Sequence, residues 1–454
     1  MIGRSLYRWE RVLLESCDLY LVGGAVRDLL LGRADDQVDR DYVARGIGLE
    51  ELERILRDFG STTFAGRSFG VLKFRTPEGP VVDIALPRKE YSTGPGHKEF
   101  EVEYDPSIPV EEDLMRRDFT MNSMAIDLRT GRLVDPLDGR GDLEKGTLRV
   151  NRDISFSEDP LRILRGVQFM ARFGLLVDER TGDLMEEHAG GISTVSPERT
   201  REELNKLMTL SERPGDGYVF MHHRGILGIV LPELERTWGV EQNEYHPDDV
   251  FHHSVKSCDM AGKDLLVRWC ALLHDLGKEP SRMEKDGRTV FYGHETESAA
   301  IAKEVLERLV FPSDFIERAV RIISAHMFMI TGEWSDAAVR RLLSRVGKEN
   351  IEPLLELRRA DGASRIGDEI EEEVEYSRER IEKVLREEAA LSRADLVIGG
   401  GEIMDLTGLA QGPRIGEIID HLFERVIEEP RLNNREDLER IVLELERGRS
   451  EEGK

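Results

Sequence analysis

Short apolar runs separated by glycine and charge mark the beginning of the chain and predict alternating strands and helices. Residues 19–22 form an apolar run that leads into Gly23-Gly24. A helix is expected from Ala25 to Leu31, where Gly32 ends it, and a second strand is expected from Asp41 to Ala44. This order of strand, glycine turn, helix and strand is typical of an α/β unit.

Two further apolar or alternating runs, at residues 71–74 and 81–86, suit paired strands in the same unit. The segment between residues 91 and 110 is rich in glycine, proline and charge, and it predicts a mobile loop. The α/β pattern extends to about residue 150.

From about Asp159 onward the spacing of apolar positions becomes helical almost throughout. Ser196-Pro197 predicts a helix start, with the serine as N-cap and the proline in the first turn. The strongly charged stretch at 368–388 is expected to be a helix with a solvated face. Gly399-Gly400-Gly401 precedes a last helical unit that ends near Arg447.

Length and charge narrow the classes of protein that fit this pattern. The chain has 454 residues, 39% of them apolar, which is enough for two to four domains with real cores. Its formal net charge of −26 argues against a protein that coats nucleic acid nonspecifically and disfavours a noncatalytic RNA-binding protein. An RNA enzyme with a local basic groove is still compatible with this charge.

The three cysteines, Cys17, Cys258 and Cys270, show no CxxC spacing and predict neither a disulfide framework nor a zinc knuckle. The first residues carry no signal-peptide pattern, and no stretch approaches the roughly 20 apolar residues of a membrane span. We therefore expect a cytoplasmic protein without a membrane partner.

The first candidate site lies at the glycine turn, where Gly23-Gly24 is followed by Arg27 and then by Asp39 and Asp41. Glycines after a strand let backbone N–H groups approach a phosphate, and an arginine can clamp triphosphate oxygens. Because side chains alternate along a strand, Asp39 and Asp41 should share one face and offer hard oxygen ligands to Mg²⁺. Asp83, on the strand expected at 81–86, is a candidate for a third carboxylate.

This order of motifs resembles the class II tRNA nucleotidyltransferases and bacterial poly(A) polymerases of the polymerase-β-like superfamily. The resemblance covers almost the whole chain and rests on LVGGAVRDLLLG with Asp39-Arg40-Asp41, on RRDFTMN at 116–122, on EDPLR at 158–162 and on PER at 197–199. It implies Mg²⁺-dependent transfer of nucleotides from CTP and ATP to the 3′ end of tRNA, whose acceptor arm the protein would bind. It also implies that Arg117 contacts the triphosphate, while Asp118 is expected to be a structural cap or a partner of Arg117.

Asp159, Arg162 and Arg165 follow one another at intervals of three, which predicts that they share one face of a helix. An aspartate acceptor beside an arginine donor offers both halves of a Watson–Crick-like edge. The family resemblance implies that this pair replaces a template, with Arg162 bonding acceptors of C or A and Asp159 accepting the exocyclic amino group. Gln168 stands where the family often has an arginine, and we expect it to bind nucleotide without a charge.

A second candidate site lies in the helical half, where ALLHDLGK resembles the core of the HD-family metal-dependent phosphohydrolases. The expected ligands are His253, His274, Asp275 and the distant Asp361, with His294 and His326 between them. Mixed histidine and aspartate ligands suit Mn²⁺, Ni²⁺, Co²⁺ or Fe²⁺, and such an ion can activate water toward a phosphate ester. The alternative is a degenerate HD fold that only builds the body of the enzyme and binds tRNA.

Together these signals predict an α+β fold. A polymerase-β-like nucleotidyltransferase head at 1–150 is followed by an all-α neck at 151–230 with the nucleotide-selecting motif, an HD body at 231–375 and a helical tail at 376–454. The expected function is template-independent CCA addition to tRNA with pyrophosphate release. Enzymes that make poly(A), or that add only CC or only A, share these motifs and stay alternatives. An HD phosphohydrolase acting on RNA ends is the alternative from another class.

Overall fold

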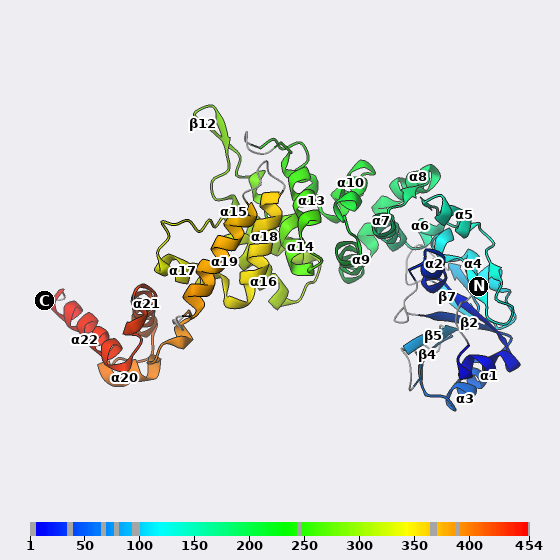
Figure 1. The fold of residues 1–454 in the computed structure, drawn as a ribbon, viewed down its shortest axis with the longest axis horizontal. Coiled ribbons are helices and arrows are strands. Elements are labelled where there is room, and N and C mark those ends of the chain that lie inside the picture. Colours follow the sequence, from blue (N-terminus) through cyan, green and yellow to red (C-terminus); the bar gives the residue numbers. More distant parts are fainter. Residues whose placement is uncertain are drawn as a thin grey trace. The chain divides into compact units, whose positions relative to one another are not determined.

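The structure is a computed structural model, and it describes residues 6–33, 40–64, 70–76, 81–92, 100–242, 247–363, 370–386 and 391–452. The chain folds into two compact units, Met1–Glu235 and Arg236–Lys454 (Figure 1). Among the helices of the described ranges, none is long and apolar enough to cross a membrane. The four-part division expected from the sequence stays a prediction.

A seven-stranded mixed sheet forms the base of the first unit, with the strand order β3-β4-β5-β2-β1-β8-β9 (Figure 1). Its strands are β1 (Asp18–Val22), β2 (Asp41–Arg45), β3 (Ser61–Phe64), β4 (Val71–Arg75), β5 (Val81–Ala85), β8 (Ala125–Asp127) and β9 (Leu133–Val134). β2 and β5 run parallel, whereas the other neighbouring strands run antiparallel. The strands expected at 19–22, 41–44, 71–74 and 81–86 are therefore confirmed.

Short helices accompany this sheet, namely α1 (Arg8–Ser16), α2 (Gly24–Leu30), α3 (Leu49–Leu56), α4 (Val110–Met115) and α5 (Gly139–Glu144). The helix expected after the glycine turn is confirmed as α2. At the start of α1 the Tyr7 N–H donates to the Glu10 carboxylate at 2.7 Å, which caps the helix. The buried Trp9 ring lies 5.2 Å from the Tyr42 ring and 5.4 Å from the Phe74 ring, and so fixes α1 against the sheet.

Of the loop expected at 91–110, residues 105–109 do form turns without helix or strand, but residues 91–92 and 100–104 lie in strands, so the prediction is wrong there. Strands β6 (Arg88–Ser92) and β7 (Phe100–Tyr104) pair antiparallel, and α4 begins at Val110. Residues 93–99 of that segment lie outside the described residues. The apolar–acidic alternation of FEVEY is a strand pattern, although the segment before it is rich in glycine and proline, which favour loops.

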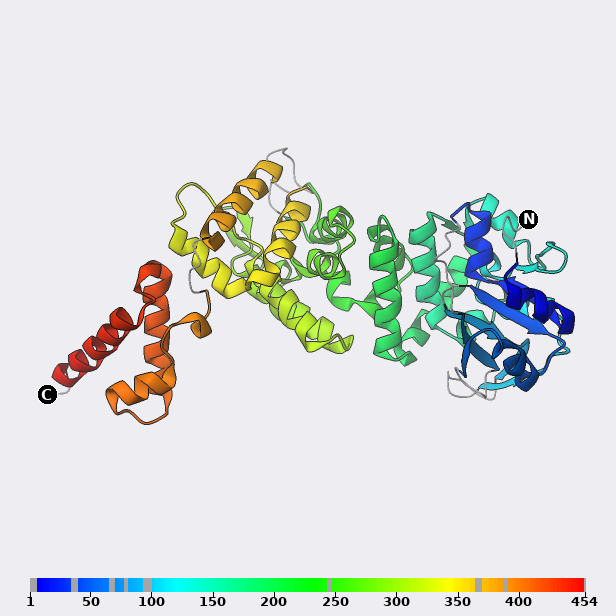
Figure 2. The ribbon, with the colours of Figure 1, turned by 60° about the horizontal axis from the view of Figure 1, so that its bottom comes forward.

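Helices make up most of the rest of the first unit. They are α6 (Ser155–Glu158), α7 (Leu161–Phe173), α8 (Glu179–Glu187), α9 (Pro197–Leu210), α10 (Gly215–His223), α11 (Leu227–Val230) and α12 (Pro232–Glu235), with a short parallel pair of β10 (Thr147–Leu148) and β11 (Leu176–Val177). α7 packs against α9 and α10 (Figure 2). The helix start expected at Ser196-Pro197 is confirmed as the beginning of α9.

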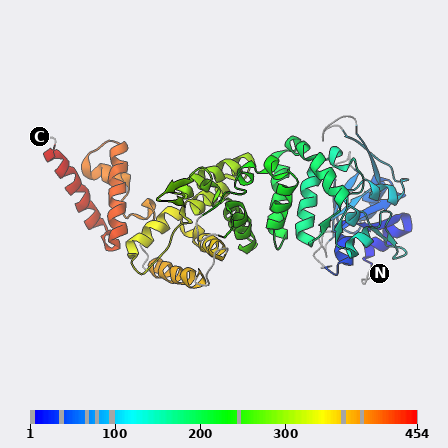
Figure 3. The ribbon, with the colours of Figure 1, turned by 90° about the horizontal axis from the view of Figure 1, so that it is seen from above.

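The second unit is built almost entirely from helices. They are α13 (Val250–Met260), α14 (Leu265–Leu273), α15 (His294–Arg308), α16 (Ser313–Ala325), α17 (Asp336–Val346), α18 (Ile351–Ala363), α19 (Ile370–Arg386), α20 (Gly400–Thr407), α21 (Pro413–Glu428) and α22 (Arg435–Glu452). β12 (Met283–Lys285) and β13 (Arg288–Val290) form a small hairpin. The last three helices, orange to red in Figure 3, share a core that includes Ile403, Leu422 and Val442. A mixed sheet followed by helices confirms the expected α+β class.

Candidate functional site

A pocket of about 520 Å³ opens in the first unit where β1 runs into the glycine turn. Its lining gathers nine of the residues expected to bind nucleotide or metal, namely Gly23, Gly24, Arg27, Asp41, Asp83, Arg117, Asp159, Arg162 and Arg165. The pocket therefore combines residues from the sheet, the RRDFTMN segment and α7. Asp39, the other expected metal ligand, lies outside the described residues.

The glycine turn brings two guanidinium groups close to the backbone. Gly23 has φ +69° and ψ −135°, a conformation that residues with a Cβ rarely adopt. A Cβ added to Gly23 would lie 2.9 Å from Nη1 of Arg117, and one added to Gly24 would lie 3.3 Å from Nη2 of Arg27. Both glycines thus make room for arginines at the wall of the pocket.

Arg27 is only 5% exposed and is held from several sides. Its guanidinium donates to Asn122 Oδ1 at 2.7 Å and to Asp28 Oδ1 at 2.8 Å, and it lies 4.5 Å from the centre of the Phe173 ring. A guanidinium fixed in this way meets a phosphate without a large loss of side-chain entropy.

Asp41 and Asp83 are direct neighbours in the sheet. The parallel pairing of β2 and β5 places Asp41 opposite Asp83, so their side chains share one face of the sheet. The Lys73 ammonium lies 3.0 and 3.1 Å from the two Asp83 oxygens. Two neighbouring carboxylates are oxygen ligands of the kind that Mg²⁺ prefers, and an ion bound to Asp83 would displace the Lys73 ammonium from it.

Asp159 does not lie on the same helix as the two arginines. It follows α6, and α7 begins only at Leu161. Its carboxylate accepts from the Leu161 N–H at 3.2 Å and from Arg199 Nη2 at 3.4 Å. The expectation of one helical face for Asp159, Arg162 and Arg165 is therefore wrong, although all three side chains line the same pocket.

The Arg162 guanidinium belongs to the lining of this pocket and forms an ion pair with Glu158. Its Nη1 lies 3.6 Å from Glu158 and makes no hydrogen bond with the described residues, although the atom is buried. A buried donor without a partner costs free energy unless a ligand satisfies it. Gln168, in contrast, is buried within α7 and is not part of the pocket lining, so its contact with nucleotide stays a prediction.

Asp118 was expected to be a structural cap or a partner of Arg117, and the second alternative is wrong, because Asp118 pairs with Arg165. Arg165 donates two hydrogen bonds to Asp118 Oδ2, at 2.9 and 2.7 Å, while Asp118 Oδ1 accepts from the Phe119 N–H at 2.8 Å. Burial alone would raise the pKa of Asp118, but the Arg165 charge outweighs it and lowers the pKa below its ordinary value. This ion pair ties the RRDFTMN segment to α7.

Asp113 is a buried partner of two pocket arginines that the sequence analysis did not single out. Its carboxylate lies 2.6 Å from Arg116 and 3.4 Å from Arg117, and the two arginines outweigh burial and lower its pKa. The intervals of three and four residues in DLMRRD were a readable signal for this pairing. The pocket lining also includes Arg88 and Arg199, which no local spacing pointed to.

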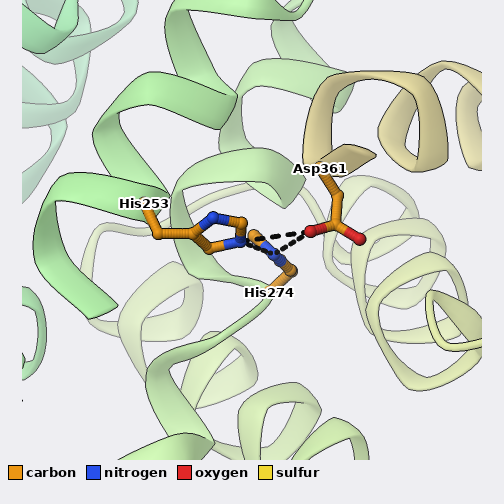
Figure 4. Close-up of side chains that lie close together, drawn as sticks. All are labelled: His253, His274 and Asp361. Carbon is orange, nitrogen blue, oxygen red and sulfur yellow. Dashed lines mark hydrogen bonds and ion pairs between the residues drawn. The ribbon is translucent and has the colours of Figure 1, made fainter. Parts of the chain in front are cut away.

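A second site lies in the other unit, where three of the expected HD ligands converge (Figure 4). His253 comes from α13, His274 follows the end of α14, and Asp361 comes from α18. The His253 Nε2 lies 3.3 Å from the His274 Nε2 and 3.1 Å from Asp361 Oδ1. All three side chains are buried, and the geometry suits a divalent ion.

Asp275, His294 and His326 surround the same centre. The His294 Nε2 lies 3.3 Å and the His326 Nε2 lies 3.7 Å from Asp275 Oδ1. The sequence placed these two histidines between the expected ligands but gave them no role. Each stands alone at a helix end, His294 at the beginning of α15 and His326 after α16, so no local motif marked it.

The electrostatics of the centre favour cation binding. Burial alone would lower the pKa of His274, but the Asp275 and Asp361 carboxylates outweigh it and raise the pKa to about 9. Burial and the nearby His274 lower the pKa of His326 to about 3. A divalent cation at this centre would displace the His274 proton and neutralise the two carboxylates.

Family models of known proteins match both parts of the chain that carry these sites. The family model described as "Poly A polymerase head domain" matches residues 19–149, "Probable RNA and SrmB- binding site of polymerase A" matches 174–237, and "HD domain" matches 243–397. Among solved structures, the Bacillus stearothermophilus CCA-adding enzyme in complex with CTP has a TM-score of 0.70 and 22% identity. The alignment covers 98% of this chain and 97% of that one, which shows a shared fold.

Relatives of similar length establish the family. The Multifunctional CCA protein of Stenotrophomonas maltophilia (strain K279a) is 37% identical over 418 residues, which cover 88% of this chain and 97% of that protein. The Multifunctional CCA protein of Xanthomonas campestris pv. campestris (strain B100) is 35% identical over 419 residues, with 88% and 96% covered. With its polymerase-type head and its HD domain, this chain belongs to the family of the multifunctional CCA proteins.

Proposed function

We propose that this chain is a tRNA nucleotidyltransferase that adds the C and A residues of the 3′-terminal CCA from CTP and ATP, releases pyrophosphate and uses no template. The observation that carries this proposal is the single pocket that gathers Asp41, Asp83, Arg27, Arg117, Asp159 and Arg162. The relatives named for CCA supply the substrate class, and the acceptor arm of tRNA is the expected partner.

Asp41 and Asp83 would hold Mg²⁺. Asp39, which is not among the described residues, is proposed as a further ligand. The carboxylates of Asp41 and Asp83 fit this ion because they stand side by side on one face of the sheet. When bound, Mg²⁺ lowers the pKa of an attacking hydroxyl and stabilises charge on the leaving group.

The guanidinium groups beside the glycine turn would hold the triphosphate. Arg27 is held by hydrogen bonds to Asn122 and Asp28. Arg117 reaches the turn at Gly23, and its Nη2 lies 3.4 Å from the Asp113 carboxylate, which is a long ion pair. Charge-assisted hydrogen bonds from fixed arginines are among the stronger polar contacts in proteins. Together they would orient the α-phosphate toward the 3′-hydroxyl of tRNA.

Asp159 and Arg162 would select the base. The Arg162 guanidinium, whose Nη1 makes no hydrogen bond with the described residues, suits the acceptors of C or A, and the Asp159 carboxylate suits an exocyclic amino group. U and G present the opposite pattern and would leave buried groups unpaired, at a cost of roughly 1–3 kcal/mol each. Gln168 and Arg165 stay proposed nucleotide contacts, although Arg165 is already engaged by Asp118.

Asp41→Asn tests this assignment. The variant should lose incorporation of labelled CMP into tRNA that lacks its CCA end, because one carboxylate charge disappears from the metal site. Asp18→Asn is the matched control, since Asp18 begins β1, pairs with Arg45 and does not line the pocket. Wild-type incorporation by Asp41→Asn would contradict the assignment.

The HD centre supports a second activity, a metal-dependent phosphohydrolase that acts on RNA ends. Buried histidines and aspartates around one centre would hold Mn²⁺, Ni²⁺, Co²⁺ or Fe²⁺, and they argue against a degenerate fold. Hydrolysis of a terminal 2′,3′-cyclic phosphate that His274→Ala abolishes and Asp41→Asn spares would support this activity. Loss of hydrolysis in both variants would contradict a separate site.

The proposed organisation of the chain is a head at 1–150, a neck at 151–230, an HD body at 231–375 and a tail at 376–454, and the proposed location is the cytoplasm. Cys17, Cys258 and Cys270 are buried free thiols, and this agrees with the cytoplasmic location expected from their number and spacing.

A further inference from the structure

We propose that Arg33 and Arg172 bind a phosphate group of the tRNA backbone, at a place one helical turn beyond the nucleotide pocket. This inference rests on the nucleotidyltransferase proposed above, and it adds a contact with the RNA strand to the contacts with the incoming nucleotide. It is carried by the guanidinium groups that gather around Phe173, by the lack of anionic partners for two of them among the described residues, and by the course of α7 away from the pocket.

Three guanidinium groups lie against the ring of Phe173. Their Cζ atoms are 4.5 Å (Arg27), 4.8 Å (Arg172) and 5.3 Å (Arg33) from the centre of the ring. Arg33 follows α2, where its N–H donates to the Asp28 carbonyl oxygen at 2.8 Å, so the backbone fixes the point from which this side chain extends. The face of an aromatic ring attracts cations, and this ring holds together charges from two distant segments of the chain.

The positive charges of this cluster are only partly neutralised by the described residues. Arg27 is paired with the Asp28 carboxylate at 2.8 Å. The side chains of Arg33 and Arg172 make no hydrogen bond or ion pair within the described part of the chain. Partial burial first, and then the Arg27 charge, lower the pKa of Arg172; Arg33 adds to this lowering and Asp28 opposes it. An anion beside the cluster would relieve this repulsion, and guanidinium groups bind phosphate oxygens especially well.

The cluster adjoins the nucleotide pocket but lies outside it. Phe169 belongs to the lining of the pocket, whereas Phe173 and Arg172 do not. Phe173 is four residues further along α7, which is about one turn or about 6 Å. Arg27 joins the two places, because it lines the pocket and also lies against the Phe173 ring. A phosphate held by Arg33 and Arg172 is therefore distinct from the phosphates of the nucleotide in the pocket.

One face of α7 leads from the pocket to this cluster. Its residues follow one another at intervals of three, four and three, and they are Arg162, Arg165, Phe169 and Arg172. Arg33 is exposed and Arg172 is partly exposed, so an RNA backbone can reach both. In a chain with a net charge of −26, a local basic surface of this kind is where a polyanion approaches. The tRNA strand whose 3′ end enters the pocket carries a phosphate on every nucleotide, and it is the polyanion that the proposed function brings here.

The test is the salt dependence of tRNA binding by the full-length chain without nucleotide. Fluorescence anisotropy of a labelled tRNA that lacks its CCA end gives the Kd at several KCl concentrations. Arg33→Met and Arg172→Met should each raise the Kd about threefold to tenfold, and should make the slope of log Kd against log salt shallower by about 0.7–0.9, because one phosphate contact is lost. Arg54→Met is the matched control, because Arg54 pairs with Glu51 on α3 and does not line the pocket, and it should keep both values. Arg172→Lys keeps the charge and should keep the slope.

Free pyrophosphate is the other source of phosphate at this place, and a second measurement separates it from tRNA. Inhibition of CMP incorporation by added pyrophosphate should be the same in Arg172→Met and in the wild type. A higher inhibition constant with an unchanged tRNA Kd would assign the cluster to pyrophosphate and overturn the inference.

Thermal unfolding is followed in parallel, and Arg172→Gln replaces the methionine variant if the latter does not fold. An unchanged Kd and slope in both variants, with or without a loss of stability, would overturn the inference while nucleotide addition by the wild-type chain stands. A wild-type chain that neither binds nor extends tRNA would overturn the proposed function and this inference together.

Discussion

Gly23→Ala is a perturbation whose effect follows directly from the geometry of the glycine turn. Gly23 has φ +69° and ψ −135°, close to a region that only glycine occupies comfortably, so an alanine there should cost about 1–3 kcal/mol of stability. Its Cβ would also lie 2.9 Å from Nη1 of Arg117, and the guanidinium has to move because the backbone of the turn is fixed between β1 and α2.

Displacement of Arg117 should weaken nucleotide binding. A hydrogen bond to a charged group is worth about 1.5–3 kcal/mol, so the KM for CTP should rise about tenfold to a hundredfold. The assay is initial-rate incorporation of CMP into tRNA without CCA over a range of CTP concentrations, with thermal unfolding followed in parallel.

Gly131→Ala separates the two effects. Gly131 has nearly the same φ, +70°, in the turn between β8 and β9, and a Cβ there would meet nothing within 4 Å. This control should lose stability and keep the KM for CTP. An unchanged KM in Gly23→Ala, or an equal rise in Gly131→Ala, would refute the role given to the turn and to Arg117.

Three further outcomes follow from the contacts in the two sites. Arg162→Ala should relax base choice, so that UMP and GMP enter tRNA at rates closer to CMP; unchanged selectivity in single-nucleotide assays would count against the template pair. Asp118→Asn should lower the free energy of unfolding by about 2 kcal/mol. This loss is smaller than the loss expected when a fully buried ion pair is broken, because the Arg165 side chain is 35% exposed. The pKa of Asp118 is lowered in the folded protein, so its stabilisation is complete at neutral pH and is lost as the pH falls below about 4. Urea titrations from pH 7 to pH 3 should therefore show the difference between wild type and Asp118→Asn shrinking; a difference that grows toward pH 3 would contradict this sign. His274→Ala should remove the divalent ion from the HD centre while CMP incorporation continues, and loss of incorporation would show that the two sites are coupled.

Much of the nucleotide site could be predicted because its signals are local. The strand before Gly23, the helix α2 and the strand that begins at Asp41 each follow from a few consecutive residues. Asp83 could be named because it is the one polar residue in the apolar run at 81–86, and the register then places it beside Asp41. The order of elements along the chain was thus readable without knowledge of their packing.

Contacts between segments that are distant in the sequence could not be predicted in the same way. The partner of Asp118 is Arg165, 47 positions later, and nothing in the local spacing distinguishes it from the neighbouring Arg117. His294 and His326 each stand alone at a helix end, and only the packing of α15 and α16 brings their rings within 5.3 Å. A spacing of three residues suggests that Asp159 and Arg162 share one face of a helix. In the structure α7 begins after Asp159, so the two residues do not lie on one helix. Tertiary packing decides such pairings, and a single sequence does not record it.

Sequencing the 3′ ends of a defined tRNA that lacks its CCA, after incubation with the purified chain and Mg²⁺, tests the proposed activity most directly. CTP alone should give ends extended by CC, ATP alone should give no run of A, and both nucleotides together should give CCA and then stop. A long A tract from ATP alone would instead mark a poly(A) polymerase, and unextended ends under all three conditions would contradict the proposal that this pocket transfers nucleotides to tRNA.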